Sequence, residues 1–171
     1  LTAYPSSAGE QELLAKVAAA RWLVPVVAVA KDTQIKDGMR VDGHAEMATV
    51  ILTTPDGQRA LPLFTGLDSL AAWDPTARPV PVSADVAAQA AVSESADTLI
   101  LDLGSAHGLA LRPSMVWALA MAREWLPAHA DPVVARGVAA AVAEESDVVG
   151  HLVEEGEPAA SGILRVVLVL R

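Results

Sequence analysis

The chain contains no cysteine and few aromatic residues, and both shortages limit what it can be. Without cysteine, disulfide bridges, thiolate catalysis and cysteine-ligated zinc are impossible. The lack of bridges fits a reducing compartment, so we expect a cytoplasmic protein. Aromatic residues make up only 4% of the chain, whereas 53% of it is hydrophobic, much of that alanine and valine. We therefore expect a core of small side chains packed around a few large ones.

Long hydrophobic runs and dense basic stretches are missing as well. Apolar runs such as Trp22 to Ala30 and Val166 to Leu170 fall short of the roughly 20 residues that cross a bilayer. The formal net charge is −9, and an acidic surface repels phosphate backbones. We expect neither a membrane nor a nucleic acid as a partner. Because the chain begins at Leu1 rather than methionine, a preceding segment could be missing.

Hydrophobic periodicity and turn residues predict alternating strands and helices. A Ser7/Glu10 capping box starts the first helix, and the polar stretch 31–45 is expected to be a loop or an irregular hairpin. Pro55-Asp56-Gly57 predicts a hairpin turn. The other expected elements are strands over 22–30, 47–54, 59–65, 78–82, 98–103, 109–111, 148–154 and 163–170, and helices over 67–73, 83–93, 113–126 and 131–144.

This order predicts an α/β fold of α+β character, in which a mixed β-sheet is flanked by helices and followed by a C-terminal helix–hairpin unit. The length of 171 residues is usual for one domain. Residues 127–171 are too few to be stable alone. We therefore expect a single domain over 1–171, with 1–126 as its core and 127–171 as a dependent extension.

The turn from Asp102 to Gly108 contains Asp102, Ser105 and His107, which are the residue types of a hydrolase triad. A nucleophile elbow needs G-x-S-x-G between a strand and a helix, and this spacing does not provide it. Serine and glycine are also common in turns for backbone reasons. We interpret the segment as a turn without catalytic residues and keep a hydrolase only as a remote alternative.

Metal and cofactor sites find little support. Asp42, His44 and Glu46 alternate, so on a strand they would share one face and could contribute to a metal site. The H-x-E pattern occurs in zinc deaminases, but their P-C-x-x-C partner motif cannot exist here. His129 and His151 are remote in the sequence. Because nucleotide-binding glycine motifs are missing too, we expect no metal and no cofactor.

The C-terminal part combines acidic residues with an apolar strand. The acidic residues favour a solvated face, with a cation site or a basic protein partner as the alternative. Ile163 to Leu170 is apolar on both faces except at Arg165, which suits an internal strand. At a sheet edge it would invite pairing between subunits, so we predict a homodimer formed through this strand or through the helix beside it. The acidic residues are Glu144, Glu145, Asp147, Glu154, Glu155 and Glu157.

Trp117, Met121 and Trp125 recur every four residues and would lie on one face of the helix expected over 113–126. They are either core anchors or a protein-binding ridge. The alanines of this helix supply little apolar area. We therefore expect Trp117 and Met121 in the core and Trp125 less buried. In the second interpretation the same three residues form a candidate interaction surface.

A family resemblance narrows the possibilities. The stretch from Val24 to Ala120 resembles the N-terminal domain of the SseB family, the enhanced serine sensitivity proteins, and Asp131 to Arg171 resembles the family's smaller C-terminal part more loosely. The resemblance implies an α/β fold and brings no established active-site residues. The turn 104–107 departs from the family's usual proline/glycine turn. The residues that carry the resemblance are Ala60 to Thr65, Leu70 with Trp73-Asp74-Pro75, Ala77 to Val82, Ala96 to Asp102, and Leu111-Arg112-Pro113.

The leading hypothesis is a non-enzymatic protein-interaction or regulatory domain of the SseB type. Its partner would be a protein, and a second copy of the chain is one candidate. The alternative is a sensor for an amino-acid-like metabolite, which the family's link to serine sensitivity suggests. A deep polar pocket would favour the sensor, an apolar patch the interaction domain, and converging Ser, His and Asp side chains the hydrolase.

Overall fold

The structure is a computed structural model that describes residues 7–30, 35–36, 39–40, 45–53 and 57–171. The chain divides into two compact units. The N-terminal unit is Ala18–Ala122, and the C-terminal unit contains 7–17 together with Arg123–Arg171. Within the described part, no helix has both the length and the apolar character needed to cross a bilayer. Whether the two units form a single domain, as expected, stays a prediction.

The first sheet of the N-terminal unit has three antiparallel strands in the order β4-β1-β7. β1 (Arg21–Ala30) lies between β4 (Ala45–Thr49) and β7 (Arg78–Ser83). Prolines cannot donate a ladder hydrogen bond, and the alternating prolines of β7 predicted an edge strand. The structure confirms that position. Two short strands, β2 (Ile35–Lys36) and β3 (Met39–Arg40), pair with each other.

The second sheet has the order β5-β6-β8-β9 and is mixed. It contains β5 (Leu52–Thr53), β6 (Arg59–Leu63), β8 (Thr98–Leu101) and β9 (Leu109–Leu111). β6 and β8 are parallel, and the outer pairs are antiparallel. The pairing of β5 with β6 confirms the hairpin expected there, although residues 54–56 of its turn lie outside the described residues.

The two sheets join where Leu23 of β1 meets Phe64, the residue after β6. The amide nitrogen of each residue donates to the carbonyl oxygen of the other over 2.9 Å. Phe64 is fully buried, and its ring centroid lies 5.3 Å from that of Trp73. This pair contains two of the six aromatic residues of the chain, which has one phenylalanine, four tryptophans and one tyrosine. Other large side chains of this unit that are fully buried are Leu61, Leu63, Leu99, Leu111, Met115 and Val116.

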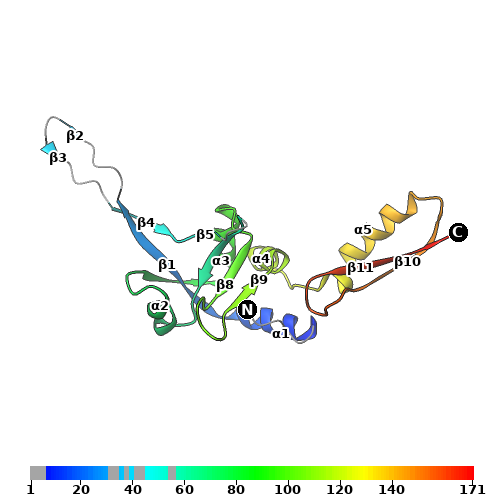
Figure 1. The fold of residues 1–171 in the computed structure, drawn as a ribbon, viewed down its shortest axis with the longest axis horizontal. Helices are drawn as coiled ribbons and strands as arrows, with labels where there is room; N and C mark the ends of the chain where they lie inside the picture. Colours follow the sequence, from blue (N-terminus) through cyan, green and yellow to red (C-terminus); the bar gives the residue numbers. More distant parts are fainter. Residues whose placement is uncertain (1–6, 31–34, 37–38, 41–44, 54–56) are drawn as a thin grey trace. The chain divides into compact units, whose positions relative to one another are not determined.

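Three helices pack against these sheets: α2 (Leu67–Trp73), α3 (Ala84–Ser93) and α4 (Pro113–Ala120) (Figure 1). α3 buries only alanines, so its backbone can approach its neighbours closely. Ser83 is the N-cap residue of α3, and its hydroxyl donates to the carboxylate of Asp85. This hydrogen bond lowers the pKa of the Asp85 carboxyl. The buried alanines of α3 show that small side chains contribute to the core of this unit, as the composition predicted.

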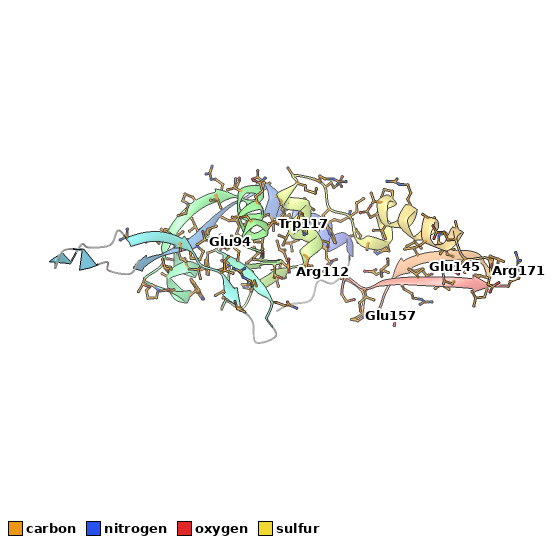
Figure 2. The ribbon with its side chains drawn as sticks, turned by 90° about the horizontal axis from the view of Figure 1, so that it is seen from above. Glu94, Arg112, Trp117, Glu145, Glu157 and Arg171 are labelled. Carbon is orange, nitrogen blue, oxygen red and sulfur yellow. The ribbon has the colours of Figure 1, made fainter. Side chains whose placement is uncertain are left out.

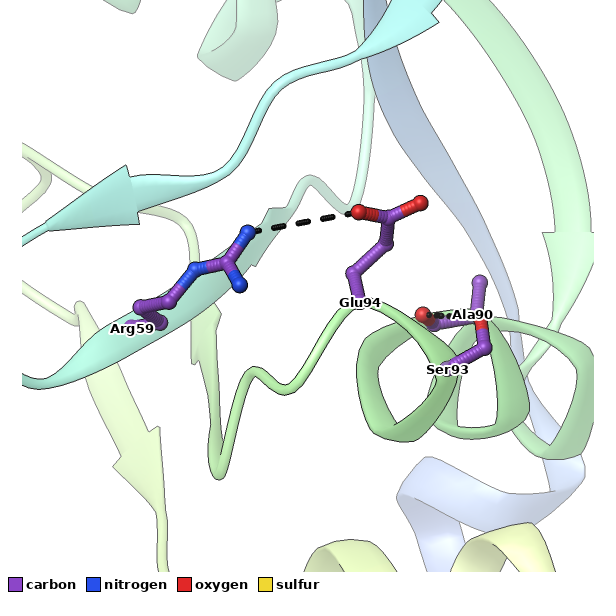
Figure 3. Close-up of polar contacts among 4 residues, drawn as sticks. All are labelled: Arg59, Ala90, Ser93 and Glu94. Carbon is purple, nitrogen blue, oxygen red and sulfur yellow. Dashed lines mark hydrogen bonds and ion pairs between the residues drawn. The ribbon is translucent and has the colours of Figure 1, made fainter.

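Polar contacts at the end of α3 lie close to the second sheet (Figure 3). The guanidinium of Arg59 on β6 lies 4.0 Å from the carboxylate of Glu94, the residue that follows α3. The hydroxyl of Ser93 donates to the carbonyl oxygen of Ala90 over 2.8 Å. Both charged side chains are largely exposed, so their attraction contributes little to stability.

The C-terminal unit consists of helices and one β-hairpin. Its helices are α1 (Ser7–Ala19), which begins at the predicted residue, the 3-10 turn η1 (Ala128–Ala130) and α5 (Pro132–Ala143). α5 starts as predicted, because the Asp131 carboxylate accepts from the amide of Val133 over 2.7 Å. The hairpin pairs β10 (Val148–Glu155) with β11 (Leu164–Leu170) in an antiparallel register.

Two predicted elements differ from the structure. The strand expected over 47–54 is divided into β4 and β5, which belong to different sheets. The helix expected over 113–126 ends at Ala120. Its chain turns at Ala122, whose φ of 50° lies in the left-handed region that ends helices. Alanine is a strong helix former, so the sequence carries no signal for this stop.

Candidate functional site

An exposed apolar surface lies at the C-terminal end of α4 and consists of Trp117, in the last turn of the helix, and Met121, its C-cap residue. Trp117 is 51% exposed and Met121 is 57% exposed. The helix places both side chains on one face, because they are four residues apart. Trp117 is labelled on this helix in Figure 2. We call these two residues the α4 surface.

The expectation that Trp117 and Met121 belong to the core is wrong. α4 buries Met115, Val116 and Leu119 instead. Successive residues of a helix are about 100° apart, so the α4 surface lies about 170° from the middle of this buried stripe. Three medium-sized side chains on one face offer more apolar area to the core than the alanines of the helix suggested. The tryptophan and methionine are left on the opposite side.

Trp125 does not share the α4 surface. The early end of α4 removes it from the helix, and its side chain is only 7% exposed. The expected order of burial is therefore reversed, since Trp125 is the buried tryptophan and Trp117 the exposed one. The four-residue spacing would place Trp125 on the same face as Trp117 and Met121 only if the helix continued to residue 126.

Two features define the ends of α4. Pro113 occupies the first helical position, where its missing N–H costs nothing. At the other end the side-chain amide of Gln89 on α3 donates to the carbonyl oxygen of Ala120 over 3.0 Å. This bond satisfies one of the carbonyl groups that a helix end leaves unpaired. The α4 surface is thus presented by a helix whose ends are fixed.

Asp102 serves the backbone rather than a catalytic triad. It follows β8, with a φ of 44°. One of its carboxylate oxygens accepts from the amide of Thr65 and the other from the Thr65 hydroxyl, both over 2.8 Å. This clamp joins the carboxyl ends of the parallel strands β6 and β8.

Ser105 and His107 lie in the turn that follows, and both are exposed. The Ser105 hydroxyl oxygen accepts from the backbone amide of His107 over 3.2 Å. The bond uses the main chain of His107 and not its imidazole, and the carboxylate of Asp102 is held by Thr65. In the described residues, these three side chains are not assembled for proton transfer.

No group of three or more potential metal-ligating side chains occurs among the described residues. Asp42 and His44 lie outside that part of the chain, as does the side chain of Glu46. His129 and His151 are in the C-terminal unit, in η1 and β10. The structure therefore does not test the Asp42, His44 and Glu46 pattern.

The acidic residues of the C-terminal unit have local roles where the structure gives them a partner. The Glu155 carboxylate accepts from the amide of Ala160 over 2.8 Å, inside the hairpin connection. Glu154 lies 3.4 Å from Arg165 on the neighbouring strand. Glu145 and Glu157 lie at opposite ends of the hairpin (Figure 2). This arrangement is that of a partly paired, solvated face.

Comparison with known proteins gives one finding. The family described as the SseB protein N-terminal domain matches residues 1–118. No curated protein and no solved structure matches the chain. The match includes the strands and turns on which the resemblance was based, whereas the looser likeness of residues 131–171 lies beyond it. Because this family match covers more than half of the 171 residues, the chain belongs to the SseB family.

Proposed function

We propose that this chain is a non-enzymatic protein-interaction domain, and that a partner protein binds the α4 surface. The observation that carries the proposal is the exposure of Trp117 and Met121 on a helix whose other large side chains are buried. A solvated tryptophan loses the stabilisation that burial would give it. Tryptophan and methionine are enriched at protein interfaces, where a few such residues supply most of the binding energy.

The position of the surface supports this proposal further. Rigid elements present contact residues with less loss of conformational entropy than loops do. α4 is packed against α3, and Gln89 of α3 donates to the carbonyl oxygen of Ala120 at its C-terminal end, so its exposed face is already formed before a partner arrives. A cytoplasmic location remains part of the proposal, supported by the absence of cysteine.

The test compares capture of partner proteins by the wild type, Trp117→Ala and Met121→Ala. Leu67→Ala is the matched control, because Leu67 is 63% exposed in the same unit but lies on α2. We expect Trp117→Ala to weaken binding of the captured protein about tenfold or more. The control should bind like the wild type. Equal binding by folded Trp117→Ala and wild type would contradict the proposal.

A thermal-shift screen, read together with the capture result for Trp117→Ala, distinguishes an interaction domain from a metabolite sensor. A ligand at about 100 times its dissociation constant stabilises a protein by about 2.7 kcal/mol. A thermal-shift screen of amino acids should give no such stabilisation if the chain is an interaction domain. A stabilising amino acid, with capture unaffected by Trp117→Ala, would favour the sensor instead.

A further inference from the structure

In the C-terminal unit, helix α5 and the strands β10 and β11 carry a largely exposed apolar surface. None of their residues is buried, although some are half-buried. A two-stranded hairpin is marginally stable at best in water, and α5 covers this one only in part. Part of this apolar surface therefore needs a cover. Its large exposed apolar residues are Val133, Val149, Leu152, Ile163, Val166, Leu168, Val169 and Leu170.

The open position is the outer edge of β11. Within the described residues, β11 pairs only with β10. α5 lies mainly against β10, and η1 contacts both strands, but among the described residues no further strand pairs with the outer edge of β11. Alternate N–H and C=O groups of an edge strand point away from its partner and can pair with another strand.

The two strands of the hairpin differ in how their edges are protected. Charged residues on an edge strand oppose pairing with another chain. β10 contains Glu154 and Glu155, whereas the only charged residue of β11 is Arg165. Glu154 lies 3.4 Å from Arg165 and offsets its charge. Joining two copies through β10 would bring acidic residues together, and joining them through β11 keeps those residues on the outside.

We propose that a second copy of this chain covers β11, and that the two β11 strands pair antiparallel about a two-fold axis at Val167. Paired residues of antiparallel strands lie on the same face, and a two-fold axis perpendicular to the sheet preserves the faces. The axis must therefore pass through a residue pair rather than between residues. Only an axis at Val167 pairs the whole of Leu164–Leu170 with itself.

This register is also compatible with the charges of the strand. It places Arg165 opposite Val169 of the partner subunit, and no arginine directly faces another. An axis one residue further, at Leu168, would place Arg165 opposite Arg171 of the partner subunit, and like charges directly opposite are destabilising. The result is a two-fold symmetric dimer with one continuous four-stranded sheet, in which each β10 forms an outer edge.

The absence of cysteine allows a direct test of this register. In a chain with Val167→Cys, the two thiols lie on paired residues whose Cα atoms are about 4.5–5.5 Å apart, which is disulfide distance. Leu152→Cys is the matched control, because Leu152 pairs with Val167 inside the hairpin. Its two copies would be three strand spacings, roughly 14 Å, apart. Mild oxidation should link most of the Val167→Cys protein into dimers and leave Leu152→Cys unlinked.

A charge pair at Val169 tests the same register without a crosslink. Val169→Lys would face Arg165 of the partner subunit and should weaken the dimer about tenfold. Val169→Glu would face the same arginine with opposite charge and should keep the dimer. Both substitutions add a charge to a side chain that is 53% exposed, so neither should unfold the hairpin. Circular dichroism checks this, and light scattering measures the mass against the 17.7 kDa chain.

Several results would overturn the proposal. They are a wild-type monomer at high concentration, crosslinking of Leu152→Cys instead of Val167→Cys, and equal dissociation of the lysine and glutamate variants. The inference is independent of the α4 surface. Trp117→Ala should therefore remain dimeric, and Val169→Lys should still capture the partner that binds α4.

Discussion

Met115 inside α4 is buried, and Met121 at the end of this helix is exposed. The same substitution can therefore be compared on its two faces. Met115 is 1% exposed and Met121 is 57% exposed. Replacing a buried methionine by alanine removes its contacts and leaves a cavity, at a cost of about 2–5 kcal/mol. The same change at an exposed position is usually within about 0.5 kcal/mol. We therefore expect Met115→Ala to be strongly destabilising and Met121→Ala to be nearly neutral.

The change in the free energy of unfolding of each variant can be measured by urea denaturation. With a slope of about 2 kcal/mol per molar urea, a loss of about 2–5 kcal/mol lowers the midpoint by about 1–2.5 M. Met121→Ala should move it by no more than about 0.25 M on the same scale. Both variants make the same methionine-to-alanine change, at Met115 inside α4 and at Met121, the C-cap residue of that helix.

The comparison can refute the assignment of the two faces. If Met121→Ala lowers the midpoint as much as Met115→Ala, the α4 surface is packed in solution and cannot be a free binding surface. If Met115→Ala leaves the midpoint unchanged, the buried stripe on α4 is wrong. Far-UV circular dichroism on both variants ensures that the measured transition starts from the same fold.

Two further substitutions test backbone features near the candidate site. Ala122→Gly should stabilise the chain by about 0.5–1 kcal/mol, because glycine adopts the observed φ of 50° without strain. The control is Ala118→Gly inside α4, which should destabilise the chain by a similar amount. If thermal denaturation shows that both changes shift stability in the same direction, the reasoning is wrong. Asp102→Ala should cost about 1–3 kcal/mol because it removes both acceptors of the Thr65 bonds, whereas Asp102→Asn keeps one acceptor oxygen and should cost less than half as much. Urea midpoints of both variants that equal the wild-type midpoint would show that the Thr65 clamp contributes nothing.

Several elements could be predicted from the sequence because local chemistry alone specifies them. Asp131 and Pro132 supply a cap and a fixed φ at the start of α5, and that helix begins there. α2 ends before Pro75 as predicted, since a proline restricts the residue before it. The prolines of β7 predicted an edge strand, and the absence of cysteine excluded whole classes of site.

The candidate surface could not be predicted in the same way. A helical pattern shows which residues share a face, but not which of two apolar faces meets the rest of the protein. On α4 the sequence offered Trp117 with Met121 or Met115 with Leu119, and only packing against α3 and β8 decided between them. The assumption that the larger aromatic residue is buried led to the wrong choice.

Tertiary structure also decided where α4 ends and where β11 lies. Ala122 adopts a left-handed conformation although alanine favours helix, so the stop depends on the path of the surrounding chain and not on the residue itself. Ile163 to Leu170 has the composition of an internal strand but occupies one side of a two-stranded sheet. Its sequence determined that it forms a strand. How many neighbours a strand has depends on residues distant in the chain, because pairing partners are brought together only by the fold.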